Sequence, residues 1–563
     1  MNRGLTLTLA IGVGLLLVTL SVMALQWESP LALAAGTPIS LEQTSPNPNL
    51  VGVAAYEGTT YWQAMSSVCY FPFAQHNPGG WSTRLYFQNA SWWTASVTIS
   101  LYSGIGSDGD PTVVVRDVVV PPNARGVYPV SDLVTGVFTG AAVIESDQPL
   151  ACSAEILNES DPAVDMMIYR TPEGGSESIA PQVRKEGAGA WNSRIVVFNH
   201  GGPSNDVYIR FYDRAGMDNG SVHLVLDDHD TWVYDVLVDN TLLPLGFEGW
   251  AHITGTLPIA VVVLNEADGK AVALTPWEGM PSCEAVLPWV ERGDLPPTQI
   301  ALYNFSDVSQ ISRTLDFHFA GDGSLDNREV HPLGARERVI RSLEDVSLPG
   351  DWWHGSVRST GLETAGMVAF SDWGTAAAGY SSLEGYSGYD FFVPNIVRYP
   401  DRYTAFTVWS HEPLNLVTVE FYDLEGKQVF SYTGEITRHV GLRFDQGMMP
   451  DLGPTFEGSA HVFAHMDIAV VVEEMVVGLP PMEDSYEPND SDADAYTIAA
   501  GVSITSFISH PDDPDWYKFE IEDPSLLTVT LDQLPADYDL VLFTDLIEPS
   551  QVPASQVMGE LAD

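Results

Sequence analysis

A strand and its turn are encoded by residues 207–216, VYIRFYDRAG, and this stretch decides the fold. Val207, Ile209 and Phe211 alternate with Tyr and Arg, the period-two pattern of a half-buried β-strand. The strand runs into an Asp-Arg-Ala-Gly sequence at residues 213–216. Asp bonds its own backbone and Gly tolerates positive φ, so these residues suit a tight reversal. The stretch therefore predicts a β-hairpin.

This hairpin recurs at residues 417–426, VTVEFYDLEG, and belongs to a unit that is copied about four times. A proline before an apolar run recurs about every 106 residues, at Pro72, Pro181, Pro288 and Pro394. A second marker, an aromatic-x-Gly segment before an alternating strand, keeps this period with Gly140, Gly249, Gly355 and Gly458. Glu-Gly pairs mark the junctions at residues 173–174, 278–279 and 384–385. Three markers with one period predict tandem units, each long enough to bury its own core.

The fold class follows from the length of this unit and from its pattern of short strands and turns. About 100 residues of short strands with frequent turn signals predict an antiparallel β-sandwich, and no later segment carries a sustained helical stripe. We expect an all-β chain, a tandem array of immunoglobulin-like β-sandwiches followed by a partial jelly-roll-like β-sandwich. The expected parts are a signal peptide or anchor (1–35), a linker (36–60), four sandwiches (61–170, 171–278, 279–385 and 386–479) and a different terminal domain (480–563).

The N-terminus has the pattern of an export signal. Asn2 and Arg3 precede an apolar run over residues 5–25, and Ala32-Leu33-Ala34 offers a small-x-small cleavage site. We expect an extracellular or cell-surface location. The run is also long enough to serve as an uncleaved anchor, which would be the chain's contact with a membrane.

The charge of the chain limits its partners. Its formal net charge is −51, from 75 acidic and 24 basic residues. A surface this negative repels nucleic acid, so nucleic-acid binding is excluded. The acidity is compatible with attraction of divalent cations or a saline habitat, and equally with a simply soluble surface.

Three cysteines leave two interpretations of the first unit. Cys69 near its start and Cys152 near its end are candidates for a disulfide, which would leave Cys283 as an odd thiol. Alternatively, Cys152 is a small buried hydrophobe, because the corresponding residues of the other units are Val261, Met367 and Val470.

The terminal segment differs from the repeats. Its motifs are DSYEPND at 484–490, PDWYKF at 514–519 and LPADYDL at 534–540. Over about residues 484–545 it resembles the bacterial and archaeal pre-peptidase C-terminal domain, which implies a small jelly-roll-like β-sandwich attached to a secreted protease or another exported protein. The four preceding units resemble, more loosely, immunoglobulin-like repeats of exported bacterial multidomain proteins. Since few residues follow the last motif, the resemblance implies a truncated sandwich and a chain that is the N-terminal portion of a longer protein.

A calcium site is one expectation for this segment. Calcium takes six to eight oxygen ligands, and acidic and amide side chains gather in two of its loops. The candidate ligands are Glu487, Asn489, Asp490, Asp512, Asp513 and Asp515. The resemblance supports calcium, since related collagen-binding modules carry it. The alternative is a proline-rich acidic linker with aspartates that cap a turn.

Other motifs have structural interpretations. The GxGxxG at residues 104–109 lies between β-like flanks and predicts a hairpin loop, because a dinucleotide site needs a helix after the glycines. The HEP at 411–413 lacks the second histidine of a zinc-protease motif. The GYS at 379–381 and at 385–387 lacks the closing glycine of a nucleophile elbow. The DDHD at 227–230 fits a solvated loop better than a weak cation site. We expect no catalytic residues.

Two tryptophan pairs are candidate sugar contacts, Trp92-Trp93 and Trp352-Trp353. An exposed indole stacks well on a pyranose ring. Neighbouring residues of a strand point to opposite faces, so one member of each pair is expected in the core.

These observations favour an exported, non-catalytic cell-surface or secreted protein, a structural or adhesive stalk of β-sandwiches that contacts cell-surface or extracellular-matrix polymers. One alternative is the accessory portion of a longer secreted hydrolase, a peptidase, whose catalytic domain lies beyond residue 563. Another is an array of carbohydrate-binding modules.

Overall fold

The computed structural model describes residues 50–477, except for 61–62, 64–65, 78–79, 105–108, 159–165, 240, 268–269, 279–282, 294–296, 308–310, 351, 362–364, 373–376, 385–387 and 450–451, together with residues 495–498 and 516–518. Nearly all of the described elements are β-strands in antiparallel sheets, which confirms the predicted all-β class. The chain divides into two units, residues 1–479 and 480–563.

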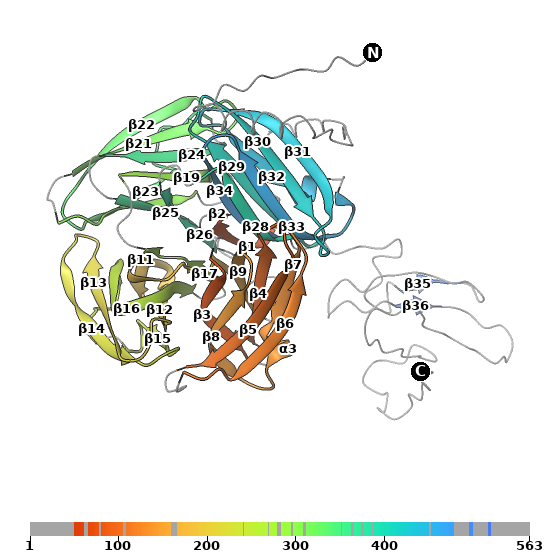
Figure 1. Ribbon diagram of the computed structural model, residues 1–563. Coiled ribbons are helices and arrows are strands. Elements are labelled where there is room, and N and C mark those ends of the chain that lie inside the picture. The colour runs from red at the N-terminus through yellow and green to blue at the C-terminus, as the bar shows by residue number, and fades with distance from the viewer. Residues whose placement is uncertain are drawn as a thin grey trace, which may run out of the picture. The chain divides into compact units, whose positions relative to one another are not determined.

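Sandwich 1 is one eight-stranded sheet folded into two layers of four strands, which are its first and second sheets and are joined where His76 pairs with Ser82 (Figure 1). The first sheet has the order β3 (Val68–His76), β8 (Phe138–Ser146), β5 (Ala95–Ser103) and β6 (Val113–Val120). The second has the order β7 (Arg125–Pro129), β4 (Trp81–Asn89), β9 (Leu150–Asn158) and β10 (Met166–Arg170), and the short helix α3 (Val130–Leu133) follows β7. Buried apolar side chains of both sheets, such as Phe71, Ile99 and Ile156, form the core between them.

Sandwich 2 repeats this order with one strand shared by both sheets. The long β16 (Phe247–Ala267) pairs with the first sheet through its first half and with the second sheet through its second half. The other elements are β11 (Gly175–Lys185), β13 (Asn205–Asp213), β14 (Asp218–Leu226) and β18 (Trp277–Glu278) in the first sheet, β15 (Thr231–Asp235), β12 (Asn192–Asn199) and β17 (Lys270–Leu274) in the second, and the 3₁₀ turn η1 (Ala188–Ala190). Strands β13 and β14 form the hairpin predicted from residues 207–216.

Sandwich 3 has two separate sheets with the same strand order. The first contains β27 (Leu383–Glu384), β19 (Glu284–Arg292), β24 (Trp353–Thr360), β21 (Ile311–Phe319) and β22 (Leu325–Leu333). The second contains β23 (Arg338–Ser342), β20 (Gln299–Asn304), β25 (Ala365–Asp372) and β26 (Ala377–Ser381).

Sandwich 4 is completed by the N-terminal end of the described chain. Its own strands are β28 (Asp390–Arg398), β33 (Phe456–Ala464), β30 (Leu414–Tyr422), β31 (Gln428–Thr437), β32 (Gly441–Asp445), β29 (Arg402–Ser410) and β34 (Ile468–Val477), with the 3₁₀ turn η2 (Gln446–Met448). The position held by β10, β17 and β26 in the other sandwiches is taken by β1 (Leu50–Glu57), which pairs with β34. The short β2 (Thr59–Thr60) pairs with β28. Residues 50–60 are therefore part of a sheet, and the expectation of a linker over residues 36–60 is wrong for them.

The recurring proline marks a β-bulge in the first strand of every sandwich. The register of β3, β11, β19 and β28 shifts where the proline stands, between Phe71 and Ala74, Ala180 and Val183, Leu287 and Val290, and Val393 and Ile396. Proline has no N–H to contribute to a ladder, so a bulge is a position where it is tolerated. The recurring proline therefore marks the same β-bulge in each of the four sandwiches.

The recurring glycine has an equally local reason. A Cβ atom on Gly140, Gly249, Gly355 or Gly458 would lie 1.9, 2.0, 2.1 or 2.0 Å from a backbone carbonyl oxygen of the neighbouring strand. That distance is far inside van der Waals contact, so only glycine fits.

Strands of all four sandwiches meet at the centre of this unit. Strand β10 contacts β17, β17 contacts β26, β26 contacts β1, and β1 contacts β10, so the four innermost strands form a closed circle. Strands β1, β17 and β26 lie together in the middle of the four sandwiches in Figure 1. Small residues line the contact, including Ala54, Ala271, Ala273, Ala377 and Gly379. Small residues allow backbones to approach closely, which lets four strands share one axis.

The closed circle differs from the extended string of independent units that the repeats predict. Each sandwich shares its core with the next, because the second sheet of one packs on the first sheet of its predecessor. Val262 and Leu264 of sandwich 2 belong to the core of sandwich 1, and Met166 and Ile168 of sandwich 1 belong to that of sandwich 4. Period-two patterns report that a strand is half-buried, but they do not report whether its other face meets water or a neighbouring unit.

The second unit, residues 480–563, is described at two short strands. Strand β35 (Tyr496–Thr497) pairs in parallel with β36 (Tyr517–Lys518). The candidate calcium ligands Glu487, Asn489, Asp490, Asp512, Asp513 and Asp515 lie outside the described residues, as does the N-terminal export signal.

Candidate binding surface and charged junctions

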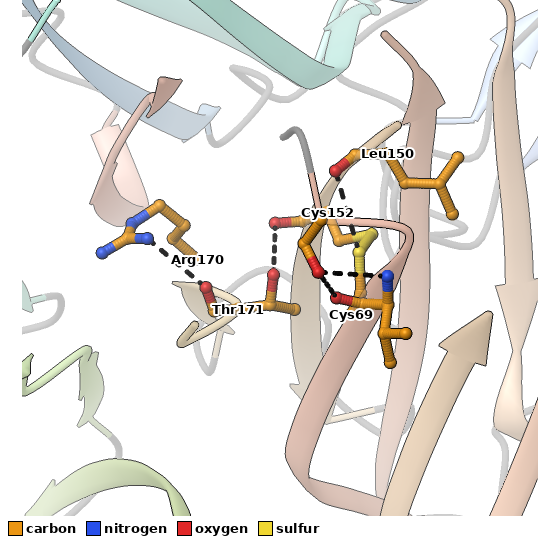
Figure 2. The surroundings of a disulfide bond; sticks show 7 residues. Cys69, Leu150, Cys152, Arg170 and Thr171 are labelled. Atoms are coloured by element: carbon orange, nitrogen blue, oxygen red, sulfur yellow. Dashed lines mark hydrogen bonds between the residues drawn. A yellow bond between two sulfur atoms is a disulfide. The ribbon is translucent and has the colours of Figure 1, made fainter. Parts of the chain in front are cut away.

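A disulfide connects the two sheets of sandwich 1. Cys69 of β3 and Cys152 of β9 are bonded, with Cα atoms 6.3 Å apart (Figure 2). The hydroxyl of Thr171 donates to the carbonyl of Cys152 at 3.3 Å (Figure 2). The corresponding core positions in the other sandwiches hold Val261, Met367 and Val470, all fully or almost fully buried. The bond therefore occupies a core position, and Cys283 is a free, exposed cysteine.

The pair Trp92-Trp93 forms an exposed aromatic surface on sandwich 1. The two residues lie in a bend between β4 and β5, and 75% and 73% of their surfaces are exposed. The expectation that one of them is a core residue is wrong, because the bend, unlike a strand, does not direct neighbouring side chains to opposite faces.

The bend that carries these tryptophans is fixed by short-range hydrogen bonds. Asn89 Nδ2 donates to the carbonyl of Trp93 at 2.7 Å, and Ser91 Oγ donates to the same oxygen at 2.9 Å. The backbone N–H of Ser91 donates to Asn89 Oδ1, and that of Trp93 donates to Ser91 Oγ. Asn89 itself is fully buried. The backbone under both indoles is therefore held in one conformation, as preorganised contacts require.

In the pair Trp352-Trp353, one member is a core residue, as the sequence predicts. Trp353 is 1% exposed, and its Nε1 donates to Asp326 Oδ2 at 2.8 Å. Trp352 is half-buried and covers Gly293, where an added Cβ would lie 2.4 Å from the indole. This pair offers less aromatic surface to a ligand than Trp92 and Trp93 do.

The residue after each bulge proline lies at a junction between two sandwiches. It contacts an Arg or Tyr of the following sandwich in each case. The contacts are Arg194 over the Phe73 ring at 5.5 Å, Gln182 N–H to Tyr303 Oη at 3.2 Å, Arg443 over the Trp289 ring at 4.7 Å, and Arg125 Nη1 to Asn395 Oδ1 at 2.7 Å. The four junctions thus occupy equivalent places and differ in chemistry.

The junction between sandwiches 4 and 1 contains a buried ion network. Arg402 donates to the carboxylates of Glu474 and Glu155, which are 1% and 0% exposed. Tyr86 Oη donates to Glu155 Oε2 at 2.6 Å, and Asn395 Nδ2 donates to Glu474 Oε2 at 2.9 Å. Burial raises the pKa of Glu474, although Arg402 opposes this shift. Each charge has a partner, as buried charges need.

The junction between sandwiches 3 and 4 has more carboxylates than its arginine neutralises, because Glu473, Asp445 and Glu291 all act on Arg443. Arg443 pairs with Glu473, while Glu291 lies in the same cleft beside Trp289 and Tyr380. Burial, and then the negative charge of Glu473, raise the pKa of Glu291 from its ordinary 4.5 to about 7, against the attraction of Arg443. A carboxyl with such a pKa holds its proton through the mildly acidic range.

Three histidines pack together at this junction. The rings of His318 and His439 are stacked with centroids 3.8 Å apart, and His411 meets His439 edge-on at 4.9 Å. Burial, followed by the neighbouring His318 and His411, lowers the pKa of His439 to about 3. Within the described part of the chain, no group of three or more His, Cys, Asp or Glu side chains is arranged to hold a metal ion.

The remaining predicted motifs fall in turns and strands. In the DDHD motif, the N–H of Asp227 donates to Asp230 Oδ2 at 3.1 Å, and His229 stacks on Tyr102 of sandwich 1 with ring centroids 4.3 Å apart. Residues 379–381 belong to the buried strand β26. Of the glycine-rich loop at 104–109, residues 105–108 lie outside the described part. Among the described residues, no helix has the length and apolar character needed to cross a membrane.

Comparison of the sequence with known protein families gave no matching family model, and comparison with curated proteins gave no match either.

Proposed function

We propose that the protein is an exported, non-catalytic surface protein, and that its circle of four β-sandwiches acts as a compact adhesive body. The observation that carries this proposal is the exposed Trp92-Trp93 surface on a bend whose backbone is held by Asn89 and Ser91. Two indoles of this kind suit the apolar faces of sugar rings, so the ligand is a polysaccharide of a cell surface or extracellular matrix.

A compact body fits the geometry better than a stalk does. The sandwiches share cores and meet along one axis, so adding a sandwich to the circle does not extend its reach. Export is proposed from the N-terminal sequence pattern.

Binding to insoluble polysaccharides tests the adhesive function. We expect the protein to sediment with at least one of cellulose, chitin and peptidoglycan, and the double variant Trp92→Ala/Trp93→Ala to lose most of this binding. Tyr208→Ala is a matched control, since Tyr208 is an exposed aromatic residue of sandwich 2. A wild-type protein that binds none of the three overturns the adhesive proposal, and a double variant that binds like the wild type overturns the site.

The terminal motifs favour a second candidate, the accessory portion of a longer secreted hydrolase. This candidate rests on the resemblance of residues 484–545 to the pre-peptidase C-terminal domain. The intact mass of the native protein tests it, because a species much heavier than 61.3 kDa would carry further domains. A mass at or below this value counts against it.

A further inference from the structure

Two arginines are buried at the junction between sandwiches 2 and 3, near enough for the charge of one to act on the other. Arg338 of β23 is 1% exposed, and Arg184 of β11 is 5% exposed. Burial, and after it the charge of Arg338, lower the pKa of Arg184 to about 10. Two like charges removed from water are costly unless something opposite in charge accompanies them.

The guanidinium of Arg338 has no hydrogen-bond acceptor among the described residues. Its Nε, Nη1 and Nη2 are all buried and all unpartnered, and the guanidinium lies over the Tyr303 ring, 5.6 Å from the ring centroid. Nε of Arg184 is unpartnered too, while its Nη2 donates to Gln182 Oε1 at 2.8 Å. Buried polar groups are almost always satisfied, so four unpaired N–H-bearing nitrogens in one junction call for an acceptor.

At the equivalent junction between sandwiches 4 and 1 the corresponding arginine, Arg125, has acceptors for both Nη atoms, and only its Nε is unpartnered. Arg125 begins β7 as Arg338 begins β23. It donates to Asn395 Oδ1 and to the carboxylate of Glu457, both at 2.7 Å.

The counterpart of Glu457 in sandwich 2 is turned to another partner. This residue is Glu248, which also precedes the glycine of the recurring marker, and its Oε1 accepts the N–H of Ala188 at 3.1 Å. At the junction between sandwiches 2 and 3 the arginine is thus present, as Arg338, but no carboxylate accepts from it as Glu457 accepts from Arg125.

The charges around Arg184 leave one positive charge uncompensated. Lys270 is paired with Asp372 at 2.7 Å, and Asp372 and Glu248 are the acidic groups that act on Arg184. Arg184, Arg338 and Lys270 therefore face two carboxylates. One negative charge would balance these groups. Because Arg338 and Arg184 are almost fully buried and lie against the Phe370, Trp191 and Tyr303 rings, a small ion suits the site better than a bulky one.

We propose that Arg338 and Arg184, with the hydroxyl of Tyr303, bind a small monovalent inorganic anion, such as chloride, between sandwiches 2 and 3. The Tyr303 oxygen accepts the N–H of Gln182, which leaves its own O–H to donate. The anion neutralises the junction and joins the two sandwiches, so occupancy stabilises the circle.

Thermal unfolding of the full chain tests the site. We compare sodium chloride with sodium gluconate at equal ionic strength, because gluconate is too large to enter, and follow tryptophan fluorescence. The wild type is expected to gain a saturable rise in unfolding midpoint with chloride, of about 2 °C or more. Arg338→Met removes the buried charge and is expected to show only the general effect of the two salts.

Arg125→Met is the matched control, since it removes the partnered arginine of the equivalent junction. It is expected to lower the midpoint in both salts and to keep the chloride-dependent rise. If chloride raises the unfolding midpoint of the wild type no more than it raises that of Arg338→Met, the proposal is overturned. If Arg338→Met does not fold, crystals of the wild type grown in bromide decide: an anomalous peak between Arg184 and Arg338 supports the site, and its absence overturns it.

Discussion

Glu291 is expected to destabilise the folded protein at and above neutral pH, so Glu291→Gln should stabilise it there. The side chain lines the same cleft as Glu473, and the arginine that acts on it, Arg443, already pairs with Glu473. Its pKa is raised to about 7 from 4.5. The folded state therefore keeps a proton that the unfolded chain loses above pH 4.5, and stability falls as the pH rises through 7.

The size of the effect follows from this shift. A rise of roughly 2.5 pH units corresponds to about 3 kcal/mol, at about 1.36 kcal/mol per unit. Because Glu291 is partly exposed and solvent screens its charge, we expect about 1–2 kcal/mol. Glutamine has the shape of the protonated acid, so Glu291→Gln should equal the wild type at pH 4 and exceed it by that amount at pH 8.

Urea unfolding at pH 4, 6 and 8 measures the difference. Glu473→Gln is the control: it removes the charge that raises the pKa of Glu291 and leaves Glu291 as a carboxylate facing Arg443, so the fall in stability between pH 4 and pH 8 should be smaller than in the wild type. Glu291→Gln that is less stable than the wild type at pH 8, or that stabilises equally at pH 4 and pH 8, would refute the reasoning.

Three further perturbations test the architecture. Replacing Cys69 and Cys152 by Ala should lower the free energy of unfolding by about 3–5 kcal/mol, because the bond closes a loop of 83 residues. Reduction of the wild type with dithiothreitol should likewise lower the unfolding midpoint, and an unchanged midpoint would contradict this prediction. Gly458→Ala should lower the free energy of unfolding by about 2 kcal/mol or more, because the added Cβ would meet a carbonyl oxygen at 2.0 Å. Gly104→Ala is the control and should be tolerated, since its Cβ would lie 3.9 Å from the nearest atom. Equal urea midpoints for the two variants would show that the close strand contact does not require glycine. Deleting residues 50–57 should expose β34 to limited proteolysis, and a digestion pattern like that of the wild type would argue against closure by β1.

The local structure of each sandwich was predictable because local rules determine it. The proline at each bulge and the glycine at each close strand contact recur at one period, and both reflect backbone constraints that only those residue types meet. Alternating apolar residues placed the hairpin of β13 and β14. These signals act over a few residues, so they survive in the sequence.

The closure of the circle depends on contacts between distant segments, for which the patterns carry little information. The innermost strands are short and buried, and β17 and β26, KAVAL and AAGYS, show no alternation that would assign their second face.

The candidate sites show the same division. The sequence singled out Trp92 and Trp93 as candidate sugar contacts, but it placed them in a strand, whereas they lie in a bend. The turn chemistry of Asn89 and Ser91, whose side chains bond their own backbone two residues on, was the missed indication of a bend. The buried arginines Arg184 and Arg338 carry no motif, and only the comparison of equivalent junctions makes Arg338 unusual.

Pairing of the first described strand with the last one of this unit sets the order in which the protein folds. Leu50 lies opposite Val477, so β1 must remain without its partner until synthesis has passed β34. Strand pairings this distant are slow to form, because a long loop has to close before any contact rewards it. Until then β34 presents an open edge that strands of other chains can occupy. In the newly made chain, sandwiches 1 to 3 can therefore be completed in turn, whereas sandwich 4 is completed only when β1 pairs with β34. At this last step, a high local concentration of chains favours exchange of β1 between them.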